Sequence, residues 1–191
     1  MDISKKIKFK SFYNQYTEII KKDNKDIYFL RSEIENNLLY RKDYTLLKQM
    51  DYFNEIYLPN RNLNKEIYLK VIPNNYSNRI IGFLRISLLN KKDIFGWESL
   101  IVSKEAPPWF AIDIIITTFN FAFNYLNKKI CAPWTVPKKG NRVKNLHLKL
   151  GFSKVIDENK KFYFFNTNKN IFNKKLINFK SLKIGQIVTT Q

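Results

Sequence analysis

Residues 109–126 constrain the fold of this chain more than any other stretch of the sequence. This stretch contains no glycine or proline, and it is too long for one strand. Pro107 and Pro108 precede it, where the start of a helix tolerates proline. Their apolar side chains cover most of a helical circumference, which predicts a buried helix. The flanking runs 95–102 and 129–136 are largely apolar, so we expect two parallel strands joined by this helix in a right-handed crossover.

The remaining segments predict an α+β fold. Apolar and polar residues alternate with period two over 5–12, which predicts a first strand, and over 66–72 and 79–88, which predict a hairpin with a long polar loop. The charged, helical pattern over 14–49 predicts helices, and a last hairpin is expected over 153–165. The expected architecture is a central, mostly antiparallel twisted sheet flanked by helices.

The charge balance predicts an anionic partner. The chain has 34 Lys and Arg against 16 Asp and Glu, a net charge of +18. Nucleic acid, a membrane surface and phosphorylated metabolites would all be attracted to it. The lysines are spread along the whole chain among many asparagines, which fits a solvated surface without a partner equally well.

The sequence also bears on location. The most apolar run, 112–123, is interrupted by Asp113 and Asn120 and is shorter than the ~20 residues of a membrane span. The N-terminus lacks the apolar core of a signal peptide. The single cysteine, Cys131, excludes an intramolecular disulfide and favours a reducing compartment, so we expect a cytoplasmic protein.

Few kinds of catalytic chemistry fit this composition. One histidine and one cysteine do not supply the usual ligand sets, so we expect no metal site. The phosphate-loop, nucleophile-elbow and dinucleotide fingerprints are absent from the sequence. Cys131 lies on an expected strand, and we interpret it as a core residue rather than a nucleophile. Acyl transfer from a thioester to an amine fits, because it requires positioning, a polarised carbonyl and proton transfer.

Two motifs resemble a known superfamily. Residues 145–152 read NLHLKLGF on a short basic helix that is expected to end at Gly151, and residues 121–126 read FAFNYL at the end of the long helix. They are similar to the "(Y/H)-x-K-x-G-F" and "aF-x-x-L" motifs of the GNAT superfamily of acyl-CoA N-acyltransferases. The resemblance implies a GNAT-like domain over 1–167 whose middle strands splay apart. A C-terminal extension, 168–191, would pack on this domain or be partly mobile.

The resemblance implies acetyl-CoA or another short acyl-CoA as co-substrate, without a metal. In this superfamily a glycine-containing loop before the central helix binds the pyrophosphate. Here the loop over 105–111 has no glycine, and its two prolines have no N–H to donate. Strand backbone would hold the pantetheine arm, while helix-start N–H groups and basic side chains would bind the phosphates. The expected cofactor-binding residues are Leu100, Ile101, Val102, Trp109, Phe110, Ala111, Lys138, Asn141, Arg142 and Lys144.

Two residues are expected to move protons. Glu98, which in a regular strand shares a face with Leu100 and Val102, would accept the amine proton directly or through water, or orient the ammonium group. The alternative is a structural carboxylate. His147 takes the position of a superfamily tyrosine that protonates the sulfur of CoA, and an imidazole pKa of about 6.5 suits a thiol pKa of about 8.5. The alternative is a histidine on the helix surface that only packs its ring.

Short matches also predict the acceptor site. Residues 29–32 and 49–57 resemble segments that border the acceptor in sugar-modifying and ribosomal-protein members, which implies acceptor-binding roles for Arg31 and Gln49. The Trp97-Glu98 pair on its expected strand resembles the corresponding strand of enzymes that act on nucleotide-linked amino sugars. This resemblance implies an acceptor-binding role for Trp97. The alternative for Arg31 is a surface ion pair with Glu33 or Glu35.

The expected function is therefore N-acyl transfer from acyl-CoA to a small anionic amine, most closely a nucleotide-linked amino sugar, whose diphosphate suits the basic surface. Two alternatives stay open. One is acetylation of a protein N-terminus or an aminoglycoside-like amine, although a polycation should be repelled by a charge of +18. The other is a nucleic-acid-binding module on a degenerate acyltransferase scaffold, which would use lysines and exposed aromatic rings. Homodimerisation is also left open.

Overall fold

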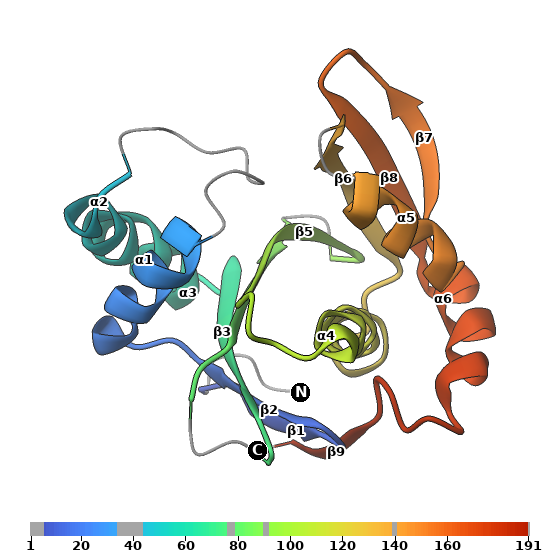
Figure 1. Ribbon diagram of the computed structural model, residues 1–191, viewed down its shortest axis with the longest axis horizontal. Helices are drawn as coiled ribbons and strands as arrows, with labels where there is room; N and C mark the ends of the chain where they lie inside the picture. Colours follow the sequence, from blue (N-terminus) through green and yellow to red (C-terminus); the bar gives the residue numbers. More distant parts are fainter. Residues whose placement is uncertain (1–5, 34–43, 76–78, 90–91, 139–140, 191) are drawn as a thin grey trace.

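The computed structural model describes residues 6–33, 44–75, 79–89, 92–138 and 141–190. These residues form one nine-stranded sheet in the order β7-β8-β6-β5-β4-β3-β2-β1-β9 (Figure 1). Neighbouring strands are antiparallel except β5 and β6, which are parallel. The mostly antiparallel sheet that the sequence predicts is confirmed. The strands are β1 Lys8–Ser11, β2 Asn14–Glu18, β3 Glu66–Pro73, β4 Gly82–Leu88, β5 Ile94–Val102, β6 Ile130–Pro137, β7 Lys154–Glu158, β8 Phe162–Asn168 and β9 Ile187–Thr190.

Helices lie on both faces of the sheet (Figure 1). The predicted long buried helix is confirmed: α4 begins at Pro108 and continues beyond Asn120 as a π-helical turn. The predicted basic helix ends one residue before Gly151, which has φ +74°. The helices are α1 Asn24–Glu33, α2 Leu46–Asp51, α3 Leu58–Asn62, α4 Pro108–Asn120, α5 Asn141–Leu150 and α6 Lys169–Leu176, with π-helical segments at Tyr52–Tyr57 and Phe121–Tyr125 and 3₁₀ turns at Lys21–Asp23 and Ile177–Phe179.

Two apolar clusters fix the faces of the central strands. The larger contains fully buried side chains of α4, such as Ile114 and Phe119, together with Phe95 of β5. The smaller joins α1 and the π-helical segment between α2 and α3 to Tyr68 of β3 and Ile101 of β5. Strands β3, β4 and β5 therefore have one face toward α4, called the α4 face, and one toward the first three helices, called the α1–α3 face.

The prediction of helix from residue 14 onward is wrong at its start, because β2 is a strand between β1 and β3. Its inward positions alternate with period two, but two of the three are polar. Asn14 is fully buried and donates to Asp113 at 2.5 Å, while Glu18 is 5% exposed and pairs with Arg61. Because buried partners satisfy these polar side chains, the strand has no hydrophobic alternation that the sequence could reveal.

The C-terminal segment belongs to the sheet and its core. Strand β9 pairs with β1, and Gly185 just before it lies against α4. The N–H of Gly185 donates to Asp113 at 3.0 Å, and its carbonyl accepts from Asn120 at 2.8 Å. Its φ of +72° favours glycine, and an added Cβ would collide with Ile116. A residue with a side chain would therefore strain this junction.

Candidate active site

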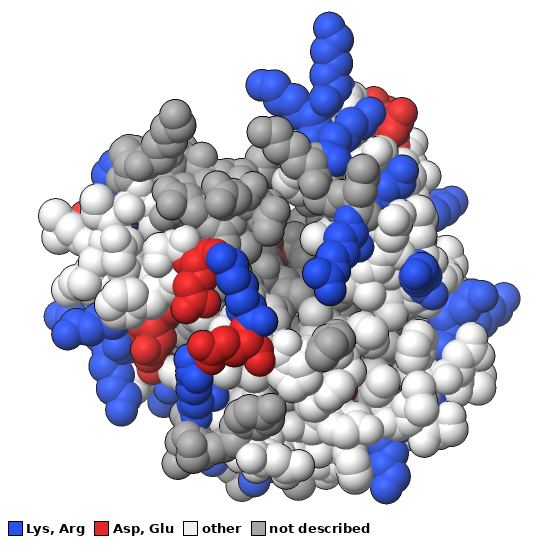
Figure 2. Space-filling view, in the orientation of Figure 1, with Lys and Arg blue, Asp and Glu red and all other residues white. Residues whose placement is uncertain are grey.

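Strands β5 and β6 part after a short paired start. Their register contains only Ile94 with Ile130 and Phe95 with Cys131, and beyond these β5 pairs with β4 while β6 pairs with β8. Figure 1 shows β6, β7 and β8 turning away from β5 beside α4. In Figure 2 the surface is hollowed between the side of α1–α3 and the side of β6–β8. The splayed middle strands that the resemblance implied are thus present.

The parting leaves the backbone of β5 open along one edge. Ser103 donates its N–H to the Ile81 carbonyl at 2.9 Å, on the side of β4. Because backbone groups alternate sides along an antiparallel strand, Ile101 also faces β4, while the N–H and C=O of Leu100 and Val102 face the gap. Two residues of the predicted pantetheine set thus present backbone groups that β6 does not pair within the described residues. An extended amide-bearing chain could add to this edge as a short strand would.

A bulge in β5 sets the direction of Glu98. Arg85 of β4 lies opposite Ser99 and the next residue, Ile86, lies opposite Trp97, so Glu98 is the extra residue. Trp97 lies on the α4 face and stacks on Phe119 with ring centroids 5.0 Å apart. Glu98 lies on the α1–α3 face, beside Arg85 and Ser87.

The expectation that Glu98 shares a face with Leu100 and Val102 is therefore wrong. Both apolar side chains pack against the α4 cluster, on the face opposite to the carboxylate. The inserted residue shifts the alternation by one position, which no regular strand pattern would do.

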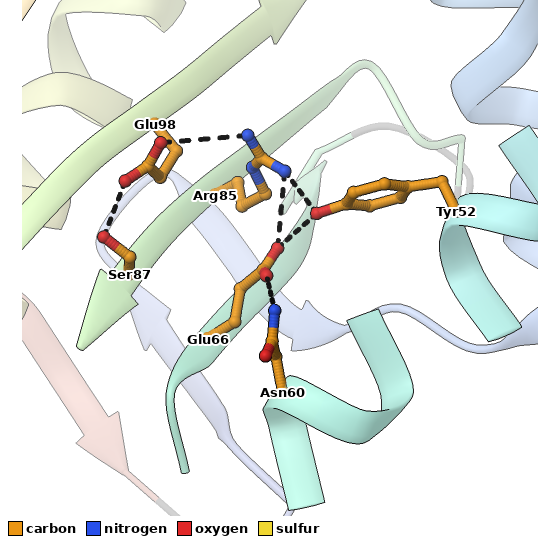
Figure 3. A network of polar contacts seen from close by, with 6 residues as sticks. All are labelled: Tyr52, Asn60, Glu66, Arg85, Ser87 and Glu98. Carbon is orange, nitrogen blue, oxygen red and sulfur yellow. Dashed lines mark hydrogen bonds and ion pairs between the residues drawn. The ribbon is translucent and has the colours of Figure 1, made fainter. Parts of the chain in front are cut away.

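A polar network holds the Glu98 carboxylate (Figure 3). Ser87 donates to its Oε1 at 2.6 Å, and a guanidinium nitrogen of Arg85 lies 3.8 Å from its Oε2. Arg85 also lies 3.5 Å from Glu66, which accepts from Tyr52 at 2.5 Å. The Glu98 side chain is 38% exposed and that of Glu66 only 8%, so Glu98 is the carboxylate that a substrate can reach.

The same network keeps Arg85 charged. Burial lowers the pKa of Arg85, but Tyr52 and Glu66 raise it by more, so the net shift is upward. Burial also raises the pKa of Tyr52, which therefore stays a neutral hydrogen-bonding phenol. One guanidinium thus faces two carboxylates, Glu66 and Glu98, and fixes both of them.

Gly96 leaves the space in which this network forms. A Cβ at this position would lie 2.6 Å from Oε1 of Glu98 and would also collide with Ser87. Any larger residue would push the hydrogen-bonded pair apart. Gly96 follows Phe95 directly, so it stands at the first position where β6 no longer pairs with β5.

The starts of α4 and α5 lie at one edge of the sheet, because each follows the carboxyl end of a parallel strand, and ligands of such strands bind at this edge. At α4, Trp109 is 36% exposed, Ala111 is half-buried and Phe110 is buried. The N–H of Phe110 already donates to the Pro107 carbonyl at 2.9 Å. With two prolines in the turn, this helix start offers few free donors to a phosphate.

Basic side chains gather at the start of α5. Lys138 and Lys144 lie over the ring of Tyr163, with their ammonium nitrogens 5.1 and 4.0 Å from its centroid. Lys138 also pairs with the exposed Glu158 at 3.4 Å, and Arg142 is exposed. Figure 2 shows Lys and Arg over this part of the surface. Asn141 begins the helix, but its side chain lies outside the described part of the chain.

His147 lies in the core rather than on the helix surface. It is 3% exposed and packs between Trp134 of β6 and Phe165 of β8, with ring centroids 5.5 and 5.4 Å away. Its Nδ1 has no hydrogen-bond partner in the part of the chain that the structure describes. Burial lowers the pKa of His147 to about 4, so the ring is neutral at pH 7 and the imidazolium that a proton donor to sulfur requires is not populated.

This burial predicts a pH-dependent stability. Between pH 6.5 and 4 the unfolded chain binds a proton at His147 that the folded chain does not, so stability falls as pH falls through this window, by about 3 kcal/mol in full. Above pH 6.5 the imidazole is neutral in both states and adds no such penalty. We expect His147→Phe to reduce the difference in unfolding free energy between pH 7.5 and 4.5 by about 2–3 kcal/mol, measured by urea unfolding. An unchanged pH dependence in the variant would contradict the assignment.

The three predicted acceptor residues lie in different surroundings. Gln49 is 1% exposed and its amide is used, because it donates to Asn24 at 2.9 Å and accepts from Tyr44. Trp97 lies on the α4 face, away from the Glu98 carboxylate. Arg31 is half-buried on α1 with its guanidinium carbon 5.3 Å from the centroid of Tyr44. Of the three, Arg31 lies with Glu98 on the α1–α3 face.

Sequence reasoning missed the residues around Glu98. Glu66 opposes Ser87 and Tyr68 opposes Arg85 in the register of β3 and β4. A signal existed, because polar residues at alternate positions of both predicted strands mark one polar face. The register that brings these side chains into one network cannot be predicted from either strand alone.

Within the described ranges, no helix is both long enough and apolar enough to cross a membrane. The described residues also contain no group of three or more His, Cys, Asp or Glu side chains that could hold a metal ion.

Solved structures resemble this one, although no protein-family model and no curated protein matches the sequence. FdhC, a nucleotide-linked sugar GNAT solved in its apo form, matches with a TM-score of 0.81 at 18% identity, over 94% of this chain and 98% of that chain. A spermidine N-acetyltransferase from Vibrio cholerae, solved with CoA and spermine, matches with a TM-score of 0.67 at 14% identity, over 84% and 98%. The ribosomal-protein-S5-alanine acetyltransferase from Vibrio fischeri matches with a TM-score of 0.66 at 12% identity, over 85% and 97%. These likenesses show that the chain has the GNAT fold, as the motifs predicted.

Proposed function

We propose that this chain, which has the GNAT fold, transfers an acetyl or other short acyl group from acyl-CoA to the amine of a small acceptor. The observation that carries the proposal is the combination of the parted strands and the bulge. The gap opens one backbone edge of β5, and the bulge directs an accessible carboxylate to the other side of the same strand. A donor and an acceptor can thereby meet at β5.

The donor would lie in the β5–β6 gap. The open backbone groups of Leu100 and Val102 suit the amides of a pantetheine arm, with Ile101 buried behind them as part of the strand. The phosphates would lie at the starts of α4 and α5. The prolines leave few N–H donors at the start of α4, so the backbone of 109–111 would make few contacts with the phosphates. Most of the positive charge that binds them would come from Lys138, Arg142 and Lys144 at the start of α5.

Glu98 would accept the proton that the amine loses. The amine nitrogen attacks the thioester carbon, the C–N bond forms, and the carbonyl oxygen takes up charge that a backbone N–H of β5 stabilises. The C–S bond then breaks with its electron pair on sulfur, and the amine proton passes to the Glu98 carboxylate directly or through water. A thiol pKa of about 8.5 lets CoA leave as a thiolate, so the step does not depend on a protonated His147.

The acceptor we propose is a nucleotide-linked amino sugar. The net charge of +18 would attract its diphosphate and repel a polyamine. Arg31 lies on the α1–α3 face with Glu98, where it could bind a negatively charged group of the acceptor. The likeness to FdhC covers more of this chain than the likeness to the spermidine enzyme.

The test is release of CoA thiol from acetyl-CoA in the presence of a panel of amines, with nucleotide-linked amino sugars beside spermidine. Binding is measured separately by thermal unfolding. Acetyl-CoA at a hundredfold excess over its Kd is expected to raise the unfolding free energy by about 2.7 kcal/mol. The proposal fails if acetyl-CoA gives no stabilisation and no acceptor releases thiol.

A further inference from the structure

Four buried polar atoms on the α1–α3 face have no hydrogen-bond partner among the described residues. They are the Nε of Arg31, the hydroxyl of Tyr68, the Nε of Arg85 and the hydroxyl of Ser99. Tyr68 opposes Arg85, and Arg85 opposes Ser99, so three of the four form one row across β3, β4 and β5. Buried polar groups in folded proteins nearly always have a partner, and a group without one indicates a water, an ion or a ligand that belongs there.

Arg31 differs from Arg85 in having no counter-charge among the described residues. Arg85 has Glu66 at 3.5 Å and Glu98 at 3.8 Å. Within the part of the chain that the structure describes, no carboxylate lies at ion-pair distance from Arg31, which rests on the Tyr44 ring instead. The surface ion pair with Glu33 considered from the sequence is therefore not formed, and Glu35, the other partner considered, lies outside the described residues. Arg85 thus faces two carboxylates, whereas Arg31 faces none among the described residues.

Arg31 stays a cation in this position. Burial lowers its pKa, but the neighbouring hydroxyls of Tyr68 and Tyr44 raise it by more, so the net shift is upward. Tyr44 in turn stacks on Tyr28 of α1, with ring centroids 5.9 Å apart, so aromatic rings fix the plane beneath the guanidinium. A fixed, charged guanidinium with no carboxylate beside it among the described residues can bind phosphate or carboxylate oxygens in its fork geometry.

We propose that Arg31 and the Tyr68 hydroxyl bind an oxyanion of the acceptor while Glu98 binds its amine. This inference rests on the proposed acyl transfer and adds the acceptor's chemistry: an amine and a phosphate or carboxylate in one molecule. Tyr68 is fully buried beside Arg31, and its hydroxyl can donate a hydrogen bond to an anion. A polyamine offers nothing to Arg31 and would be repelled by its positive charge.

The first experiment compares acceptors in the thiol-release assay. Glucosamine 1-phosphate and UDP-glucosamine carry phosphate, muramic acid carries carboxylate, and glucosamine carries no anion. Arg31→Gln is expected to raise KM about 10- to 100-fold for the acceptors whose oxyanion is bound, and to leave the KM for glucosamine and acetyl-CoA unchanged. Whether the phosphates or the carboxylate respond identifies the oxyanion. An equal change for glucosamine would overturn the inference.

The second experiment measures binding without turnover, so that it decides the inference even if no acceptor is acylated. Inorganic pyrophosphate is titrated by calorimetry into the wild type, Arg31→Gln, Tyr68→Phe and Lys25→Gln, each saturated with CoA so that the proposed phosphate site at the start of α5 is already occupied. Lys25→Gln is the matched control, since it removes the same charge from an exposed position of α1. The inference predicts a loss of about 10-fold or more for Arg31→Gln, a smaller loss for Tyr68→Phe and none for Lys25→Gln. Absence of binding to the wild type, or equal losses for Arg31→Gln and Lys25→Gln, would overturn it.

Discussion

Replacing Glu98 by glutamine is expected to lower kcat for acyl transfer by about 100- to 10,000-fold, the range that a general base contributes. The amide has nearly the same shape and can still accept the hydrogen bond from Ser87, but it cannot take the proton that the attacking amine loses. The KM for acetyl-CoA should change little, because the proposed donor site lies along the gap edge of β5. Initial rates of thiol release at saturating acceptor measure both constants.

Glu55→Gln is the control for this experiment. Glu55 is an exposed carboxylate of the π-helical segment before α3, and its loss removes the same charge away from β5. Its turnover should equal that of the wild type. If Glu98→Gln also keeps the wild-type kcat, Glu98 is a structural carboxylate held by Arg85, which is the alternative weighed from the sequence.

Replacing Asp113 by asparagine is expected to lower the unfolding free energy by about 3–5 kcal/mol. Asp113 is fully buried in α4, and burial raises its pKa although the donors around it oppose that shift. An amide retains one acceptor oxygen and turns an NH₂ group toward buried donors. Its carboxylate accepts from Ser11 at 3.1 Å, Asn14 at 2.5 Å, Tyr16 at 3.3 Å, Thr117 at 3.4 Å and the N–H of Gly185 at 3.0 Å.

Urea unfolding at pH 7 measures this effect, and a thermal scan should show a melting temperature lower by about 10 °C. Asp51→Asn, at an exposed position of α2, is the matched substitution and should stay within about 0.5 kcal/mol of the wild type. A comparably small change for Asp113→Asn would mean that water replaces the lost acceptor. The size of the expected effect reflects position, since this one carboxylate joins β1, β2, α4 and the segment before β9.

The fold could be predicted where apolar patterns are long. Residues 109–126 are too many for one strand, so their length predicted a helix, and the hairpin of β3 and β4 follows from period-two alternation. Strand β2 could not be predicted, because its inward residues Asn14 and Glu18 look like surface residues until Asp113 and Arg61 lie beside them. A single sequence does not show which polar residues will pair in the core, so neither partner of a buried polar pair can be recognised as buried.

The candidate site could be predicted only in part. The resemblance led to Glu98 and Arg31, which lie together on the α1–α3 face. Sequence alone could not give the direction of Glu98, because a one-residue bulge changes no composition and no spacing that a pattern would detect. Nor could it give the burial of His147, since the rings that cover it come from β6 and β8.

The bulge also bears on the order of events if acyl transfer takes place at β5. The proposed donor site lies along the gap edge of β5 and Glu98 lies toward α1–α3, so the two substrates would reach this strand from different directions. The single thiol of the chain, Cys131, is fully buried, and burial raises its pKa, so it is poorly suited to carry the acyl group. Both substrates would then be held at once in a ternary complex, and CoA would depart only after the amine had arrived.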